Sequence, residues 1–196
     1  MGKIFYLMGK SASGKDTIYK KLRECCPKLR TIVLYTTRPM RDGETDGVEY
    51  HFTTPDQLAR FEKAGKVIEL RTYQTVCGPW SYATVDDGQI DLKQRDYLMI
   101  GTLESYEKML AYFGKTAMEP IYVTVDDGVR LERALARERL QREPKYAELC
   151  RRFLADEEDF SEKNRKRCGI TKEYCTDDLN ACVREIMETV FSIQNH

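Results

Sequence analysis

The chain has 196 residues and a mass of 22.9 kDa, a size typical of one domain that folds without disulfides or a structural metal. It carries 32 Lys+Arg and 32 Asp+Glu, so its formal net charge is zero. We therefore expect neither a nucleic-acid nor a membrane partner, because both favour a basic surplus. No apolar run approaches the roughly 20 residues of a membrane span. We expect a cytoplasmic protein, either a monomer or a homodimer.

The cysteines and histidines do not form a metal-binding pattern. Seven cysteines are an odd number, no CxxC pair is present, and the only histidines are His51 and His196. Reduced thiols in a cytoplasm explain this composition better than disulfides or zinc. Cys168, Cys175 and Cys182 recur every seven residues, which leaves a functional thiol open as a minor alternative.

The first elements follow a strand–turn–helix order. The apolar run Lys3–Met8 predicts a short buried strand, and residues 9–14 form a Gly/Ser-rich turn. Lys15–Cys26 has the apolar spacing of a helix and ends before Pro27. Thr31–Tyr35 predicts a second strand.

The next segment changes character. Residues 36–54 are rich in Arg, Gly, Asp and Pro, which indicates a loop with short strand pieces. Pro55–Ala64 predicts a short helix, with Thr54 as its N-cap. Val67–Leu70 and Trp80–Val85 predict two further strands.

The second half returns to alternating strands and helices. The expected elements are strands Asp96–Gly101 and Pro120–Val125, and helices Leu103–Phe113, Val129 to a break at Pro144, a second stretch to about Ser161, and a last helix after Thr176 or Asp177. Asp126 and Asp127 stand where helix N-caps stand.

This order predicts an α/β fold with a parallel sheet covered by helices on both faces, in one domain spanning residues 1–196. Residues 1–35, 92–136 and 153–196 form the expected three-layer core. The strand-rich segment 36–91 predicts an inserted subdomain. The charged, proline-interrupted segment 137–152 predicts a mobile helical lid.

The first motif is a near match to a P-loop, the glycine-rich phosphate-binding turn between a strand and a helix. Main-chain N–H groups of such a turn converge on an anion, and its lysine adds a charge near the outer phosphates. We expect this P-loop to bind the phosphates of a nucleotide, with Lys15 as a candidate catalytic residue. The phosphate-binding residues expected here are Gly9, Ser11, Ala12, Ser13, Gly14, Lys15, Asp16 and Thr17.

One position departs from the P-loop pattern. Asp16 stands where a Ser or Thr normally ligates Mg²⁺, and Thr17 follows it. A carboxylate is a suitable oxygen ligand for a hard cation, directly or through water. We therefore expect Asp16 to contribute to Mg²⁺ binding. The alternative is an ordinary glycine turn without a ligand.

The second motif is the segment 35–52, YTTRPMRDGETDGVEYHF. Two arginines three residues apart, Arg38 and Arg41, predict a fork that grips one phosphate, and Tyr50 adds a hydroxyl donor. The alternative is a solvated loop in which these arginines pair with Asp42, Glu44 and Asp46 of the same segment.

Together the two motifs resemble the guanylate kinase family, sharply over about Lys3–Thr84 and more loosely over the rest. The resemblance implies a P-loop kinase that uses ATP and Mg²⁺ to phosphorylate GMP and dGMP. It implies that Arg38, Arg41 and Tyr50 bind the acceptor phosphate, with Arg38 also catalytic. His51 is expected to pack or hydrogen-bond beside Tyr50.

The resemblance also implies residues for the acceptor base. Glu69, within GKVIE, matches the glutamate that accepts hydrogen bonds from the guanine N1–H and 2-amino group. Tyr82 and Thr84, within SYAT, match residues that touch the phosphate and the guanine edge. The catalytic lid arginines map best to Arg137 and Arg152. Competing arginines are Arg133, Arg139, Arg142 and Arg151.

Two segments depart from the family pattern. Ile100 and Thr102 replace carboxylates at a strand end that contacts the acceptor base and the metal's water shell. Thr176 replaces an asparagine near the donor's adenine. Two alternatives therefore stay open: a kinase of another small phosphorylated acceptor, and a non-catalytic guanylate kinase-like binding module. In either kinase reading the acceptor oxygen is already ionised, so no catalytic histidine is required.

Overall fold

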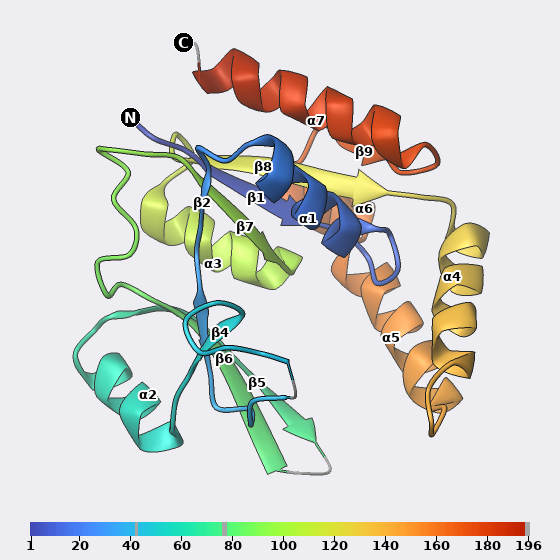
Figure 1. Ribbon diagram of the computed structural model, residues 1–196, viewed down its shortest axis with the longest axis horizontal. Coiled ribbons are helices and arrows are strands. Elements are labelled where there is room, and N and C mark those ends of the chain that lie inside the picture. The colour runs from blue at the N-terminus through green and yellow to red at the C-terminus, as the bar shows by residue number, and fades with distance from the viewer. Residues whose placement is uncertain (42, 76–77, 195–196) are drawn as a thin grey trace.

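The computed structural model describes residues 1–41, 43–75 and 78–194. Its centre is a parallel five-stranded sheet in the order β2-β7-β1-β8-β9 (Figure 1). The strands are β1 (Ile4–Met8), β2 (Arg30–Thr31), β7 (Tyr97–Gly101), β8 (Met118–Thr124) and β9 (Glu173–Cys175). The parallel sheet of an α/β fold is therefore confirmed.

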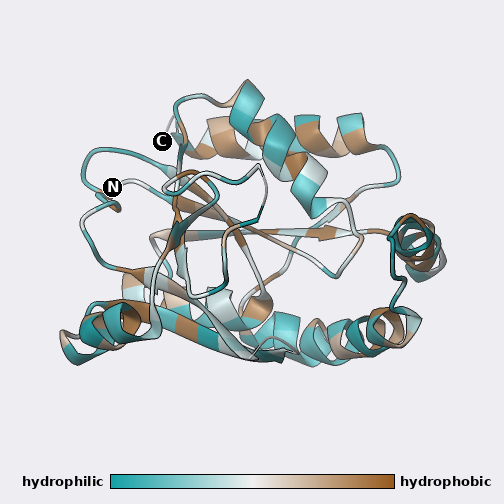
Figure 2. Cartoon of the chain, turned by 60° about the horizontal axis from the view of Figure 1, so that its bottom comes forward, coloured by the Kyte–Doolittle hydropathy of each residue, from teal (hydrophilic) through white to brown (hydrophobic). Residues whose placement is uncertain are grey.

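Helices cover both faces of this sheet, which gives the expected three layers (Figure 1). α1 (Lys15–Cys25) and α7 (Leu179–Gln194) pack on the face that Phe5 and Leu7 of β1 point to. α3 (Leu103–Phe113) packs on the opposite face. Every residue of β1 is buried because successive side chains enter the two cores in turn. Figure 2 shows apolar residues on the central strands and hydrophilic residues along the outer sides of the helices.

A second sheet has four strands in the order β4-β3-β6-β5 and carries α2 (Pro55–Lys63) beside it. Its strands are β3 (Leu34–Thr36), β4 (Tyr50–Phe52), β5 (Val67–Thr75) and β6 (Gly78–Val85). Thr54 caps α2 as expected, since its hydroxyl accepts from the Gln57 amide at 3.2 Å. Most of this sheet lies within residues 36–91, although the assignment of 36–91 as an inserted unit stays a prediction.

The expected strand Thr31–Tyr35 is wrong. The chain leaves the five-stranded sheet after Thr31 and joins the four-stranded sheet at Leu34. Between them the side chain of Gln89 binds the backbone of Val33, accepting from its N–H at 2.8 Å and donating to its carbonyl at 3.2 Å. A single apolar run does not reveal that its two ends pair with different sheets.

Two helices with mostly polar surfaces follow β8: α4 (Asp127–Arg139) and α5 (Tyr146–Asp159). Asp126 caps α4, as expected, by accepting from the amides of Gly128 and Val129 at 2.8 and 3.2 Å. The break near Pro144 is confirmed, since it lies between the two helices. The short helix α6 (Glu162–Arg167) and strand β9 were not predicted, because neither is long enough to show a periodic pattern.

Candidate active site

The turn between β1 and α1 has the backbone of a tight anion-binding loop. Gly14 has φ 91° and Ala12 has φ 63°, so both lie in the left-handed region. Gly9 approaches β8 so closely that a Cβ there would lie 2.5 Å from the carbonyl oxygen of Val123. The glycines at both ends of the motif are therefore required by the backbone itself.

Two internal hydrogen bonds fix the loop, and one of its buried hydroxyls has no hydrogen-bond partner among the described residues. The Ser13 amide donates to the Lys10 carbonyl at 3.2 Å, and the buried Thr176 hydroxyl donates to the Ser13 carbonyl at 2.8 Å. The Ser13 hydroxyl is buried and has no hydrogen-bond partner among the described residues. An unpaired buried hydroxyl inside a glycine-rich turn fits a loop that receives a polar ligand.

Lys15 and Asp16 begin α1 and carry opposite charges. The Lys15 Nζ lies 3.9 Å from the Asp16 Oδ2, and the Asp16 side chain is 82% exposed. The described residues contain no cluster of three His, Cys, Asp or Glu side chains able to hold a metal ion. Mg²⁺ commonly binds through one or two carboxylates plus substrate phosphates and water, so a single exposed carboxylate fits a metal that arrives with a nucleotide.

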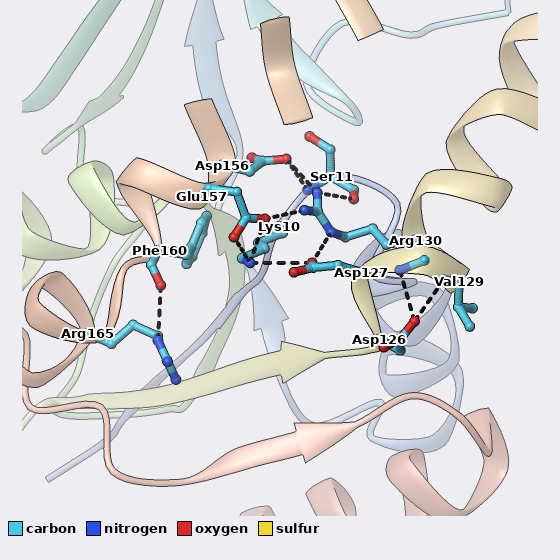
Figure 3. Close-up of polar contacts among 11 residues, drawn as sticks. Lys10, Ser11, Asp126, Asp127, Val129, Arg130, Asp156, Glu157, Phe160 and Arg165 are labelled. Atoms are coloured by element: carbon cyan, nitrogen blue, oxygen red, sulfur yellow. Dashed lines mark hydrogen bonds and ion pairs between the residues drawn. The ribbon is translucent and has the colours of Figure 1, made fainter. Parts of the chain in front are cut away.

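An ion network ties the loop to α4 and α5 (Figure 3). The side chain of Arg130, from α4, is 2% exposed and lies 3.3 Å from a carboxylate oxygen of Asp156 on α5. The same Asp156 oxygen accepts from the Ser11 amide at 2.8 Å. Glu157 pairs with both Arg130 and Lys10. The charges of two helices therefore support the loop from outside the turn.

A cavity of about 750 Å³ lies beside α4, α5 and the segment between them, and we call it the lid cavity because residues 137–152 were predicted to form a lid. Both expected lid arginines, Arg137 and Arg152, line it together with Ser11 of the phosphate loop. Arg152 also donates from Nη2 to the Ser11 hydroxyl at 3.1 Å. Arg41, from the segment between β3 and β4, also lines this cavity. The structure thus gathers arginines from three segments next to the phosphate loop.

Of the competing arginines, Arg142 also lines this cavity, whereas Arg151 is 66% exposed and paired with Glu148 on its own helix. Arg133 approaches the loop, since a Cβ placed on Gly14 would lie 3.9 Å from its Nη1. The choice of Arg137 and Arg152 stays a prediction.

On the acceptor side, Arg38 is buried and forms a two-pronged ion pair with Glu44, at 2.7 and 3.0 Å. Glu44 also accepts from the Arg41 amide at 2.7 Å. The Arg38 guanidinium lies over the rings of Tyr50 and Phe52, 5.3 and 5.6 Å from their centroids. Its hydrogen bond to Glu44 raises the pKa of Arg38 and lowers that of Glu44.

The pairing of Arg38 with Glu44 matches the charge pair that the solvated-loop reading expected, but Arg38 is buried rather than solvated. Asp42, the other neighbour named there, lies outside the described residues. The guanidinium of Arg41 faces the lid cavity, so the two arginines do not line one pocket in this structure. Whether they grip one phosphate stays a prediction.

A second cavity, of about 480 Å³, lies between α1 and the four-stranded sheet. Asp16 lines it from the start of α1, and the expected acceptor residues Tyr50 and Tyr82 line it from β4 and β6. The rings of Tyr50 and Tyr82 meet edge to face at 5.7 Å. Burial raises the pKa of the Tyr50 hydroxyl above its ordinary value, so this group stays protonated and able to donate.

Glu69 and Thr84 meet across β5 and β6, next to Arg71 and Tyr82, which line this cavity. The two residues are paired in the register of β5 and β6, and the Thr84 hydroxyl donates to Glu69 Oε1 at 3.1 Å. The Glu69 side chain has no exposed surface and forms an ion pair with Arg71. Sequence reasoning missed Arg71, whose only signal is its position two residues after Glu69 on the same strand face.

Other predicted features fall outside this site. The ring of His51, which was expected to pack or hydrogen-bond beside Tyr50, lies against the ring of Tyr35, with centroids 4.7 Å apart and planes tilted by 35°. Six of the cysteines are free, and Cys77 lies outside the described residues. No helix within the described part of the chain is long and apolar enough to cross a membrane.

Comparisons with known proteins agree on one family. A family model described as guanylate kinase matches residues 1–96. A protein named guanylate kinase from Helicobacter hepaticus is 28% identical over 138 residues, which cover 70% of this chain and 68% of that protein. The guanylate kinase of Frankia casuarinae is 51% identical over 63 residues, 32% of this chain and 34% of its own length. That of Syntrophotalea carbinolica is 32% identical over 88 residues, 45% of this chain and 42% of its own length.

The matched segments thus span less than half of the last two relatives.

A solved structure supports the fold over the whole chain. The crystal structure of guanylate kinase from Anaplasma phagocytophilum superposes with a TM-score of 0.69 at 17% identity, covering 98% of this chain and 86% of that one.

Proposed function

We propose that this chain, which belongs to the guanylate kinase family, transfers the terminal phosphoryl group of ATP to the phosphate of a nucleoside monophosphate, with GMP and dGMP as the acceptors that the family implies. The observation that carries this proposal is the cavity of about 480 Å³ that Asp16 lines beside the phosphate loop and Tyr50 and Tyr82 line from the opposite sheet. Two substrates that must meet end to end require such a shared space.

The donor end is proposed to rest on the phosphate loop. Its main-chain N–H groups and the Lys15 ammonium place positive charge where the outer phosphates of ATP would lie. Bound with the nucleotide, Mg²⁺ supplies further neutralisation of phosphate charge. Asp16 is the residue proposed to orient that ion.

The acceptor phosphate is proposed to bind among Arg38, Arg41, Tyr50 and Tyr82. Glu44 keeps the Arg38 guanidinium in a fixed orientation through two hydrogen bonds. Such a group loses little freedom when a ligand arrives, which favours positioning of the attacking oxygen. That oxygen forms the new P–O bond, while the bond between the β- and γ-phosphates of ATP breaks and leaves ADP.

The segment 137–152 is proposed to act as the lid over residues 36–91, which are proposed as the acceptor-binding insert. Arg137 and Arg152 line the same cavity as Arg41 and as Ser11 of the phosphate loop. Their charges would stabilise the phosphoryl group during transfer, and closure would exclude water, which otherwise hydrolyses ATP. The cytoplasmic location, the monomer or homodimer state and the lack of a nucleic-acid partner stay predictions.

The experiment that tests this proposal is an ADP-release assay with ATP, Mg²⁺ and one acceptor at a time: GMP, dGMP, AMP, UMP or CMP. ADP formation that depends on an acceptor supports it, and Lys15→Ala is the loss-of-function control. If nucleotides raise the thermal unfolding midpoint but no acceptor supports ADP release, the chain is instead a binding module.

A further inference from the structure

The cavity of about 480 Å³ between α1 and the four-stranded sheet is called the acceptor cavity from here on. Its far end, opposite Asp16 of α1, is formed by one face of β5 and β6. Glu69, Arg71 and Tyr73 alternate on β5, and Thr84 and Tyr82 oppose the first two on β6. Because side chains alternate between sheet faces, these five groups share one face. Among the described residues, the cavity lining includes Arg71, Tyr73 and Tyr82 but not Glu69 or Thr84. A ligand in the cavity therefore meets Arg71 before it meets Glu69.

The hydrogen bonds of Glu69 are mostly used within the protein. Oε2 accepts from Arg71 Nε at 3.0 Å, and Oε1 accepts from Arg71 Nη2 at 3.2 Å and from the Thr84 hydroxyl at 3.1 Å. A carboxylate oxygen accepts about two hydrogen bonds, so Oε1 has no capacity left. Guanine would need to donate both N1–H and its 2-amino group to this carboxylate, and the present pairing leaves no room for both.

Arg71 offers the opposite chemistry. Its guanidinium has five N–H donors, of which three are used, two by Glu69 and one by the Thr102 hydroxyl at 3.2 Å. Burial is the largest single influence and disfavours its charge, but Glu69, Tyr6 and Tyr73 together more than offset burial and raise the pKa of Arg71 above its ordinary value. The remaining donors belong to a group that stays charged and lines the cavity.

The neighbouring strand end supports this arrangement. Tyr6 reaches under Gly101 so closely that a Cβ on Gly101 would lie 2.0 Å from its hydroxyl oxygen. The next residue, Thr102, supplies a neutral hydroxyl to Arg71, and Ile100 presents an apolar side chain to the cavity. Neither residue adds a carboxylate that would compete with Glu69 for Arg71.

We propose that Arg71 is a specificity-determining residue. Its N–H groups favour a base that presents hydrogen-bond-accepting oxygens at the far end of the acceptor cavity, instead of guanine with its N–H donors. This inference rests on the proposed phosphoryl transfer to a nucleoside monophosphate, and it replaces GMP and dGMP, the acceptors that the family implies, as the preferred acceptors. The ligand class is a nucleoside monophosphate whose base carries a carbonyl or anionic oxygen where guanine carries its 2-amino group.

A matched series of purine acceptors tests the inference. The bases of GMP, IMP and xanthosine monophosphate have the same heavy-atom skeleton except at position 2, which carries an amino group, a hydrogen or an oxygen; the carbonyl of xanthine also changes the protonation of N3. For the wild-type chain we expect kcat/KM to rise in that order. Arg71→Ala frees Glu69 to accept from guanine, so we expect the ratio of xanthosine monophosphate to GMP to fall at least about tenfold, which corresponds to about 1.4 kcal/mol.

Two further variants keep the test decisive. Arg71→Lys retains the charge but not the forked pairing with Glu69, so we expect a ratio of xanthosine monophosphate to GMP between those of wild type and Arg71→Ala. It also serves as the test variant if Arg71→Ala does not fold. Arg60→Ala removes an exposed arginine from α2 and should leave the ratio unchanged. Calorimetric binding of the three nucleotides reads the same cavity without turnover.

The outcomes separate this inference from the proposed function. A wild-type preference for GMP that Arg71→Ala leaves unchanged overturns the inference while the kinase stands. Tightest binding of xanthosine monophosphate without ADP release supports the inference and removes the proposed function. Binding of none of the three nucleotides overturns both.

Discussion

The phosphate loop and the acceptor cavity are built from different materials. The loop consists of main chain, shaped by Gly9 and by positive φ angles at Ala12 and Gly14. The acceptor cavity consists of side chains that arrive from α1, β4, β5, β6 and β7. A site built from main-chain N–H groups still binds an anion when most side chains are replaced. A site built from side chains can change its ligand when one residue is replaced. Arg71, which pairs with Glu69, is such a residue.

The largest expected effect is the loss of the lysine of the phosphate loop. We expect Lys15→Ala to lower kcat for phosphoryl transfer about a hundredfold to a thousandfold, because in the proposed mechanism this ammonium stabilises charge on the transferred phosphoryl group. ADP release under saturating substrates measures the effect. Lys20→Ala, an exposed lysine of the same helix, is the matched control and should retain activity. Near-normal turnover of Lys15→Ala would show that the loop does not bind the donor as proposed.

The support of the loop from α4 and α5 is the next largest effect. We expect Arg130→Met to lower the free energy of unfolding by about 3 kcal/mol, because it leaves Asp156 in a poorly solvated site without its cation. Urea titration followed by circular dichroism measures this change. Arg151→Met removes an arginine that is 66% exposed, and its cost should stay below about 0.5 kcal/mol. Equal effects of the two substitutions would contradict a structural role of the network.

A smaller effect is expected from replacing Asp16, the carboxylate that follows Lys15 at the start of α1. If Asp16 orients Mg²⁺, Asp16→Ala should raise the Mg²⁺ concentration for half-maximal activity about threefold to tenfold, because one oxygen ligand among several is lost. The assay is turnover against Mg²⁺ at fixed ATP, and Glu24→Ala on the same helix is the control. An unchanged Mg²⁺ dependence rejects the role of Asp16.

The smallest effect concerns the acceptor side and depends on pH. Hydrogen bonding to Arg38 lowers the pKa of Glu44 in the folded chain, so the pair stabilises the fold fully above the ordinary glutamate pKa of about 4.3. This contribution is lost as pH falls through the lowered pKa. Glu44→Gln should therefore be less stable than wild type near pH 7, and the difference should shrink towards about pH 3. A difference that does not vary with pH would show that the ionised carboxylate is not what matters.

Several elements were predictable because their signals are local. The helix Leu103–Phe113 has the predicted bounds, and α1 ends one residue before the predicted Cys26. Both depend on apolar spacing and end signals within a dozen residues. The strand prediction Thr31–Tyr35 failed because strand pairing is decided by partners far along the chain, here β7 and β6.

The candidate site shows the same division. The residues of the phosphate loop form one continuous motif, so their proximity follows from their order. Arg130, Asp156 and Ser11 come from three separate segments, and their charges alone did not distinguish a buried network from solvated surface pairs. Glu69 was identified through its motif, but the partner that uses its hydrogen bonds was not.

The sequence by itself determined the phosphate loop, the alternation of strands and helices and the resemblance to guanylate kinases, because spacing and backbone preference act between near neighbours. Only the tertiary structure decided that Arg71 occupies the carboxylate of Glu69, that Glu44 holds Arg38 and that α4 and α5 anchor the loop. Those contacts depend on which charged groups lose their water together when distant segments pack, and that pairing is a property of the folded chain.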